Sequence, residues 1–338
     1  MLKPIIKSAT KLVKAFTHST VDKELLLRYN NKRGLLSPSQ TRWIYTYYVL
    51  NRLLESKEAV EKVIKEMKLK TVALNLLQWE QIENIRDLLS LFANTVNDLE
   101  GENYPTINRV IPALKHLISK LKDKVNEPYG RTEIDVVRRE LKVEIENKFA
   151  FILDPSQLDF QPAHMIATFF DPKYVKGLKI DQRNFCMKII IRDILSTLPR
   201  PTSRADISST FVAPPSSFMP SGEEYEGFFE DAEETTQIAL NEYDQLKRLR
   251  AKLEVYVHLV LSCETDIADP ISFWAGKITT FGDIAKYALN ILMVPASSAG
   301  IERVFSLASV VQGGQRYRLS AKSTEKELMI KVNRDFLV

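Results

Sequence analysis

The chain has only two cysteines among its 338 residues, Cys186 and Cys263, and neither has another cysteine or histidine at metal-ligand spacing. This pattern disfavours a zinc site and a disulfide framework, and it fits a reducing intracellular compartment. No apolar run reaches the roughly 18 residues that a membrane span requires, and the first residues lack a long uncharged segment. We therefore expect no membrane partner.

Glycine is also scarce, at 11 positions, whereas 45% of the residues are hydrophobic and 27% are charged. Such a balance is typical of a folded, helix-rich chain and not of a disordered or fibrous one. Strand-like alternation is rare, although the first 45 residues could hold one or two strands. The expected fold class is mainly α.

Basic residues are unevenly distributed, although the net charge of +4 is too small to indicate a nucleic-acid partner. Residues 1–40 contain eight lysines and arginines against Asp22 and Glu24, whereas residues 205–246 contain no basic residue. The basic amino end could contact DNA phosphates without sequence preference. A solvated helix face explains the same pattern.

Apolar residues recur at three- and four-residue steps through 44–67, 82–99, 107–121 and 134–149, which predicts a bundle of helices. Prolines, serines and an acidic run then dominate residues 199–234, and we expect a flexible acidic linker there. Helical patterns resume from about residue 235 and continue to the end.

The last seventy residues contain a dense series of motifs: DPISFW, FGDIAKYALNILMVPASSAGIERVFS, RYRLS and KELMIKVN. Thr280 can cap a helix whose third residue is Asp283, and Pro295 stops that helix. Ser297 and Ser298 are placed to cap the next helix, whose first turn carries Glu302.

This order of motifs closely resembles the C-terminal dimerisation region of hAT-family transposases. The matching positions are Asp269, Pro270, Trp274, 295–299, Glu302, Arg303, Phe305, Ser306, Arg316, Leu319, Leu328 and Asn333. Two further segments are similar to the same family, namely Thr-Arg-Trp at 41–43 and FFDPKYVKGL at 169–178. The chain thus resembles the C-terminal part of a transposase, or a transposon-derived or truncated zinc finger BED/hAT-like protein.

The resemblance implies a ribonuclease H-like core that a large helical insertion interrupts, with the C-terminal block completing the core and supporting dimerisation. The expected domains are a remnant of that core at 1–45, a helical insertion at 46–198, the linker at 199–234 and the dimerisation region at 235–338. The implied fold class is mainly α, with a helical insertion bundle and an incomplete ribonuclease H-like module.

In this family two aspartates and one glutamate hold two divalent metals for phosphodiester cleavage. By resemblance Glu302 takes the glutamate position, but the aspartates should precede 41–43, where the sequence offers only Asp22, in a helix-start context. We expect no transposase activity, no resident metal, and a use for Mg²⁺ only if missing aspartates were supplied. Otherwise Glu302 is a first-turn helix acid or the partner of Arg303 or Arg316.

The resemblance also implies binding residues. Arg42 and Trp43 would lie near DNA, although an aromatic residue at this spacing also fits a buried anchor and Arg42 a solvated arginine. Trp274, Leu292, Phe305 and Leu328 would lie in or beneath the dimer interface. The sequence has neither a BED-type zinc finger nor a P-loop, so we expect no small-molecule substrate.

The leading hypothesis is a non-catalytic, transposase-derived protein that forms a homodimer or oligomer, or pairs with related hAT proteins. One alternative is a fragment of an active cut-and-paste DNA transposase. Another is a regulatory protein that binds DNA non-specifically through the basic amino end. The resemblance implies a nuclear location, and a cytoplasmic one is also compatible with the sequence.

Overall fold

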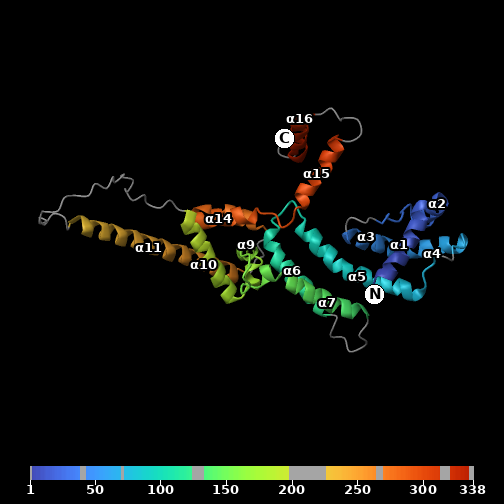
Figure 1. Cartoon of the computed structure of the whole chain (residues 1–338), viewed down its shortest axis with the longest axis horizontal. Helices are drawn as coiled ribbons and strands as arrows, with labels where there is room; N and C mark the ends of the chain where they lie inside the picture. The colour runs from blue at the N-terminus through green and yellow to red at the C-terminus, as the bar shows by residue number, and fades with distance from the viewer. Residues whose placement is uncertain are drawn as a thin grey trace, which may run out of the picture. The chain divides into compact units, whose positions relative to one another are not determined.

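The computed structural model describes residues 2–38, 43–69, 72–123, 133–197, 226–263, 269–312 and 320–334. These residues form sixteen α-helices and two short 3-10 helices, with no strand among them (Figure 1). The mainly α prediction is confirmed. A ribonuclease H-like module needs a sheet, and the described residues do not show one.

The chain forms two compact units, Met1–Gln161 with Pro295–Val338, and Pro162–Val294. We call them unit 1 and unit 2. The helical insertion that we expected at 46–198 is divided between the two units after Gln161, and the expected C-terminal block is divided after Val294.

Unit 1 begins with four helices, α1 (Leu2–His18), α2 (Thr20–Tyr29), α3 (Trp43–Glu55) and α4 (Lys57–Glu66). Their apolar faces share one core, in which Leu12, Phe16, Leu26, Leu53 and Val60 are at most 1% exposed. The strands considered for the first 45 residues were wrong for the described part, because α1, α2 and the start of α3 lie there and its other described residues form no strand. The single helix expected over 44–67 is divided at the buried Ser56.

The middle of unit 1 consists of α5 (Leu76–Leu99), α6 (Val110–Asp123), α7 (Glu133–Lys148) and the short α8 (Ala150–Leu153). Asn75 and Gln78 start α5 by a reciprocal capping box, which satisfies two amide donors at the helix start. α5 packs against α3 on one side and α6 on the other, and α6 packs against α7 (Figure 1).

Unit 1 also contains the last two helices, α15 (Ala299–Gln312) and α16 (Ala321–Val332), which pack against each other. We call this pair the C-terminal hairpin. The Ser320 hydroxyl caps α16 by accepting a hydrogen bond from the Ser323 amide at 3.2 Å. Just before α15 the Ser297 hydroxyl accepts a hydrogen bond from the Ala299 amide at 3.4 Å.

Unit 2 is formed by α9 (Ala163–Phe169), α10 (Ile180–Thr197), α11 (Glu226–Ser262), α12 (Pro270–Ala275), α13 (Ile278–Phe281) and α14 (Asp283–Leu292). The last nine residues of the expected linker, 226–234, belong to α11, and residues 198–225 lie outside the described part. Thr280 lies inside α13 and does not cap the next helix. Gly282, with φ +58°, joins α13 to α14 in a conformation that side chains disfavour.

Candidate functional site

Trp274 is the central side chain of unit 2 and is 0% exposed. Asp269 positions it by capping α12, because its carboxylate accepts hydrogen bonds from the amides of Ile271 and Ser272 at 3.0 and 3.1 Å. The indole Nε1 of Trp274 donates to the backbone carbonyl of Phe170 at 2.7 Å. The indole therefore satisfies a carbonyl at the end of α9.

A second hydrogen bond of the same kind lies beside it, because the hydroxyl of the fully buried Tyr256 donates to the Phe169 carbonyl at 2.9 Å. The rings pack closely, with centroids 4.7 Å apart for Tyr256 and Trp274 and 5.2 Å apart for Phe170 and Trp274. The two segments that resemble hAT transposases around Phe169 and Trp274 thus form one core. In this conformation Trp274 has no surface that a partner could contact.

Leu292 is also 0% exposed, at the end of α14 within unit 2. Phe305 is 68% exposed on α15, and Leu328 is half-buried on α16. The structure therefore places the four expected interface residues in two different environments. Trp274 and Leu292 belong to the core of unit 2, whereas Phe305 and Leu328 belong to the C-terminal hairpin of unit 1.

The C-terminal hairpin exposes an unusual amount of apolar side chain. Ile301 is 61% exposed and Phe305 68%, one turn apart on α15, and Met329 and Ile330 are each 60% exposed on α16. Large apolar side chains that gather on one small element mark contact surfaces more often than isolated exposed residues do. We call these four residues the hairpin apolar face.

Polar contacts attach the hairpin to the loop after α5. The Ala296 amide donates to the hydroxyl of the buried Thr106 at 2.9 Å. The Arg303 guanidinium donates to the Glu100 carbonyl at 2.8 Å and pairs with the Glu102 carboxylate. Sequence reasoning missed this attachment, because its residues are some 200 positions apart and no local pattern connects them.

Glu302 lies exposed in the first turn of α15, where the Ser298 hydroxyl is 3.4 Å from its carboxylate. A helix start favours a negative charge, so this position has a structural explanation. Arg303 pairs with Glu102, which differs from the Glu302–Arg303 pair considered above. Arg316 lies outside the described residues.

The position of Asp22 is explained by the start of α2. Asp22 is 7% exposed in the first turn of α2, and its amide donates to the Ser19 hydroxyl that caps this helix, at 3.3 Å. Within the part of the chain that the structure describes, no group of three histidine, cysteine or acidic side chains could hold a metal ion.

The expected DNA-binding pair cannot be placed. Arg42 lies outside the described residues, and of Trp43 only the backbone is described, as the first residue of α3. Likewise, among the described helices none is both long enough and apolar enough to cross a membrane.

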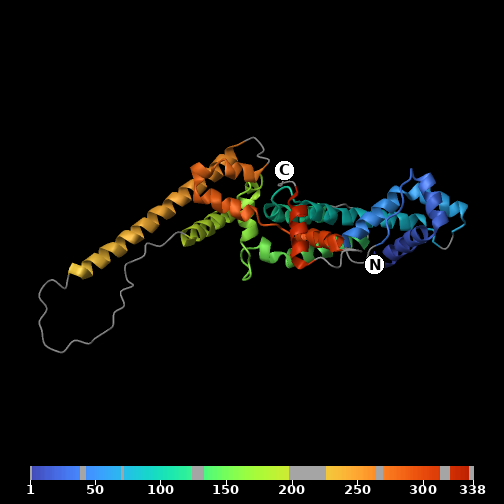
Figure 2. The ribbon, with the colours of Figure 1, turned by 90° about the horizontal axis from the view of Figure 1, so that it is seen from above.

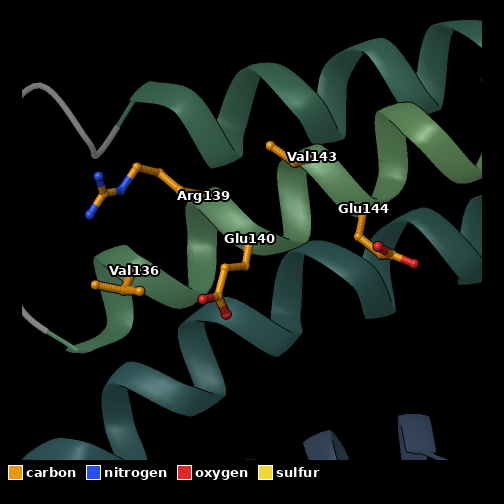
Figure 3. A pocket seen from close by; sticks show the side chains of 5 residues that line it. All are labelled: Val136, Arg139, Glu140, Val143 and Glu144. Carbon is orange, nitrogen blue, oxygen red and sulfur yellow. The ribbon is translucent and has the colours of Figure 1, made fainter.

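The described surface of unit 1 includes two hollows. The larger, of about 500 Å³, is lined by Val136, Arg139, Glu140, Val143 and Glu144. All five side chains come from α7, and they do not converge on one point (Figure 3). The smaller, of about 350 Å³, follows α1 and is lined by Ile6, Lys7, Thr10, Lys11 and Lys14.

The lysines of α1 form a row along the helix. Lys3, Lys7, Lys11 and Lys14 are all exposed, and their spacing of four, four and three residues places them on one side of the helix. α1 contains no acidic residue. We call these four residues the α1 lysine row; their spacing is also visible in the sequence.

Packing explains the shifted pKa values of two titratable groups. Burial raises the pKa of the Cys186 thiol to about 12. Burial, and then the hydrogen bond to Asp193 at 2.8 Å, raise the pKa of Tyr287. Each group therefore stays protonated near neutral pH.

Comparison with known proteins identifies a family region in this chain. Residues 242–336 match the hAT family C-terminal dimerisation region, so the chain carries that region, as its motifs predicted. The match begins in α11 and ends beyond α16, and it therefore contributes both to the core of unit 2 and to the C-terminal hairpin.

Over most of its length the chain is distantly similar to three named relatives. It is 22% identical to human zinc finger BED domain-containing protein 4, over 98% of this chain and 27% of that protein. It is 23% identical to human zinc finger BED domain-containing protein 6, over 97% and 35% of the two. It is also 23% identical to the putative AC transposase of Zea mays, over 88% and 36%. The chain thus spans about a third of the length of these relatives or less.

Proposed function

We propose that the chain is a transposase-derived protein that acts through self-association, or through pairing with related hAT proteins, and that the hairpin apolar face is the contact surface. The observation that carries the proposal is the exposure of Ile301, Phe305, Met329 and Ile330 on two helices inside the matched dimerisation region. A second copy can present the same apolar surface and bury both.

Burial of the hairpin apolar face would contribute favourable free energy to a complex. Burying a phenylalanine side chain completely contributes about 1.5–3 kcal/mol. Phe305 is two-thirds exposed, so most of that contribution is still available to an interface. The free energies do not simply add, because association has its own entropic cost.

Phe305→Glu tests the proposal, because a carboxylate at the centre of an apolar contact would be desolvated without a partner. Sedimentation of the full chain should show a dimer or larger oligomer that dissociates at least about tenfold more readily in this variant, a loss of about 1.4 kcal/mol. Val143→Glu is the matched control, since Val143 is 53% exposed on α7 and is not part of the hairpin. A monomeric parent chain at micromolar concentration would refute the proposal.

We further propose that the chain does not cleave DNA, and that Glu302 is a first-turn helix acid and not a metal ligand. Its exposed position and its contact with Ser298 support this assignment. The test is incubation with labelled transposon-end DNA and Mg²⁺ or Mn²⁺. Cleavage that disappears in Glu302→Gln would instead support the alternative of a piece of an active transposase.

The α1 lysine row favours a second candidate function, non-specific association with DNA. Its four lysines span about 16 Å along the helix axis, a length that corresponds to roughly five phosphates on one strand of a duplex. Each neutralised phosphate releases counterions, so binding of this kind weakens as salt rises. A nuclear location would accompany either function.

Changing Lys3, Lys7 and Lys14 to glutamine tests the second candidate. In a mobility-shift assay the logarithmic dependence of the binding constant on salt should become shallower by about two to three. Lys62, Lys65 and Lys68, which are exposed near the end of α4, are the matched control lysines. Equal binding by the two triple variants would exclude the lysine row as the contact.

A further inference from the structure

The longest helix, α11, carries its charges in two separate blocks. Its first seventeen residues, 226–242, include six acidic residues and no lysine, arginine or histidine. The next ten, 243–252, include four basic residues and one acidic residue. We call these stretches the acidic block and the basic block.

The basic block lies outside the core of unit 2. Lys247, Arg248, Arg250 and Lys252 are all exposed. Among residues 243–262, whose side chains the structure describes, burial starts only beyond them, with Leu253, Tyr256 and Val260 at 0 to 1% exposure. Both ribbon views show α11 extending well beyond α10 and α14 of the same unit (Figures 1 and 2).

The two blocks cannot neutralise each other within one chain. Their centres are about fourteen residues apart, which corresponds to roughly 20 Å along an α-helix. This distance exceeds the Debye length of about 8 Å at physiological salt, so their mutual attraction is screened. Within the basic block, Arg250 has a local partner, Glu254, at 3.1 Å.

Apolar residues lie between the charges. The sequence places Ile238, Ala239 and Leu240 at the end of the acidic block, and Tyr243 and Leu246 follow with 54% and 39% exposure. In proteins, most of the stability of a helix comes from packing of its apolar side chains against another element. The exposed apolar side chains offer such a contact.

We propose that the α11 helices of two copies pair antiparallel, with the acidic block of each beside the basic block of the other. A parallel pair would bring like charges together, whereas the antiparallel pair brings opposite charges together at both ends and apolar residues together in the middle. The acidic block disfavours nucleic acid as the occupant, because it repels phosphate. This surface belongs to unit 2 and is separate from the hairpin apolar face.

Charge reversal in the full chain tests the pairing. The first variant changes Lys247, Arg248 and Lys252 to glutamate, and the second changes Glu230, Asp231, Glu233 and Glu234 to lysine. In each variant both blocks have the same sign, so self-association should weaken by at least about tenfold. In a one-to-one mixture the variants are complementary, and association should return to within about threefold of the parent.

Three controls make the outcome decisive. Changing Lys62, Lys65 and Lys68 of unit 1 to glutamate alters the net charge by the same amount as the first variant, and it should have little effect. Repeating the series with Phe305→Glu separates this pairing from the hairpin, because the charge effects should persist when the hairpin contact is lost. A mixture that associates no more tightly than either variant alone would overturn the proposal, as would an equal loss in the control.

Discussion

Replacing Trp274 by phenylalanine removes one hydrogen bond and part of one ring from the centre of unit 2. The lost indole N–H leaves the Phe170 carbonyl, now bonded at 2.7 Å, without its donor inside the core. An unsatisfied buried carbonyl costs about 1–3 kcal/mol, and the smaller ring adds a cavity cost. We expect Trp274→Phe to lower the free energy of unfolding by about 2–4 kcal/mol.

Tyr256→Phe separates the two contributions, because it removes the hydroxyl that donates to the Phe169 carbonyl and keeps the ring. Its expected cost is about 1–3 kcal/mol. Urea titration followed by circular dichroism measures both variants, and sedimentation measures self-association of the folded chains. If Trp274→Phe left the unfolding transition unchanged and weakened self-association tenfold, Trp274 would be an interface residue and our reasoning would be refuted.

Two further predictions concern unit 2. Asp269→Ala should cost about 1 kcal/mol by removing the cap of α12, and Asp269→Asn should cost less, because its amide oxygen can still accept one of the two backbone bonds. The hydrogen bond from Ser272 lowers the pKa of Asp269. The stabilisation by this cap should therefore be complete above the ordinary pKa of 3.8 and disappear as the pH falls through the lowered value. Urea midpoints at about pH 7 and pH 3 check this dependence. Burial and the raised pKa should protect the Cys186 thiol from alkylation at about pH 8 until the chain unfolds. The half-buried Cys263 should instead react in the native protein, and mass spectrometry can distinguish the two sites.

Sequence patterns predicted helices well where local chemistry determines them. Three- and four-residue apolar spacing located α5 and α6, and Ser297 lies just before α15 as expected. The patterns failed where the position of a helix boundary depended on contacts with residues distant in the sequence. The break at Ser56 is an example, because its buried hydroxyl accepts a hydrogen bond from Asn30, 26 residues earlier.

The sequence predicted which residues belong to the candidate site but not where they lie in the fold. The motifs identified Trp274 and Phe305 as members of one region, yet the first is buried in unit 2 and the second is exposed in unit 1. A sequence motif does not by itself reveal whether an aromatic residue is exposed. Trp274 is buried against a distant segment of the chain, and the carbonyl that accepts its indole hydrogen bond is 104 residues away. The same limit explains why the contact between Arg303 and Glu102 was missed.

The Arg303 contact carries a last prediction. Its partners Glu100 and Glu102 lie in a loop that Arg109 holds by pairing with Asp98 at 2.7 Å and by lying 3.9 Å from the Tyr104 ring centre. Because Arg303 and Glu102 are about half exposed, their ion pair contributes only about 0.2–1 kcal/mol. Its main effect is therefore expected to be on the orientation of the hairpin.

Arg303→Ala should change the unfolding midpoint little but increase hydrogen exchange in α15 and weaken self-association, because a less ordered hairpin has more entropy to lose on pairing. Arg303→Lys should be intermediate, since lysine keeps the charge but not the forked geometry that reaches a carbonyl and a carboxylate together. Glu102→Gln keeps an acceptor oxygen and should have a smaller effect than Arg303→Ala. Unchanged exchange and unchanged association in Arg303→Ala would show that the packing of α15 on α16 alone orients the apolar face.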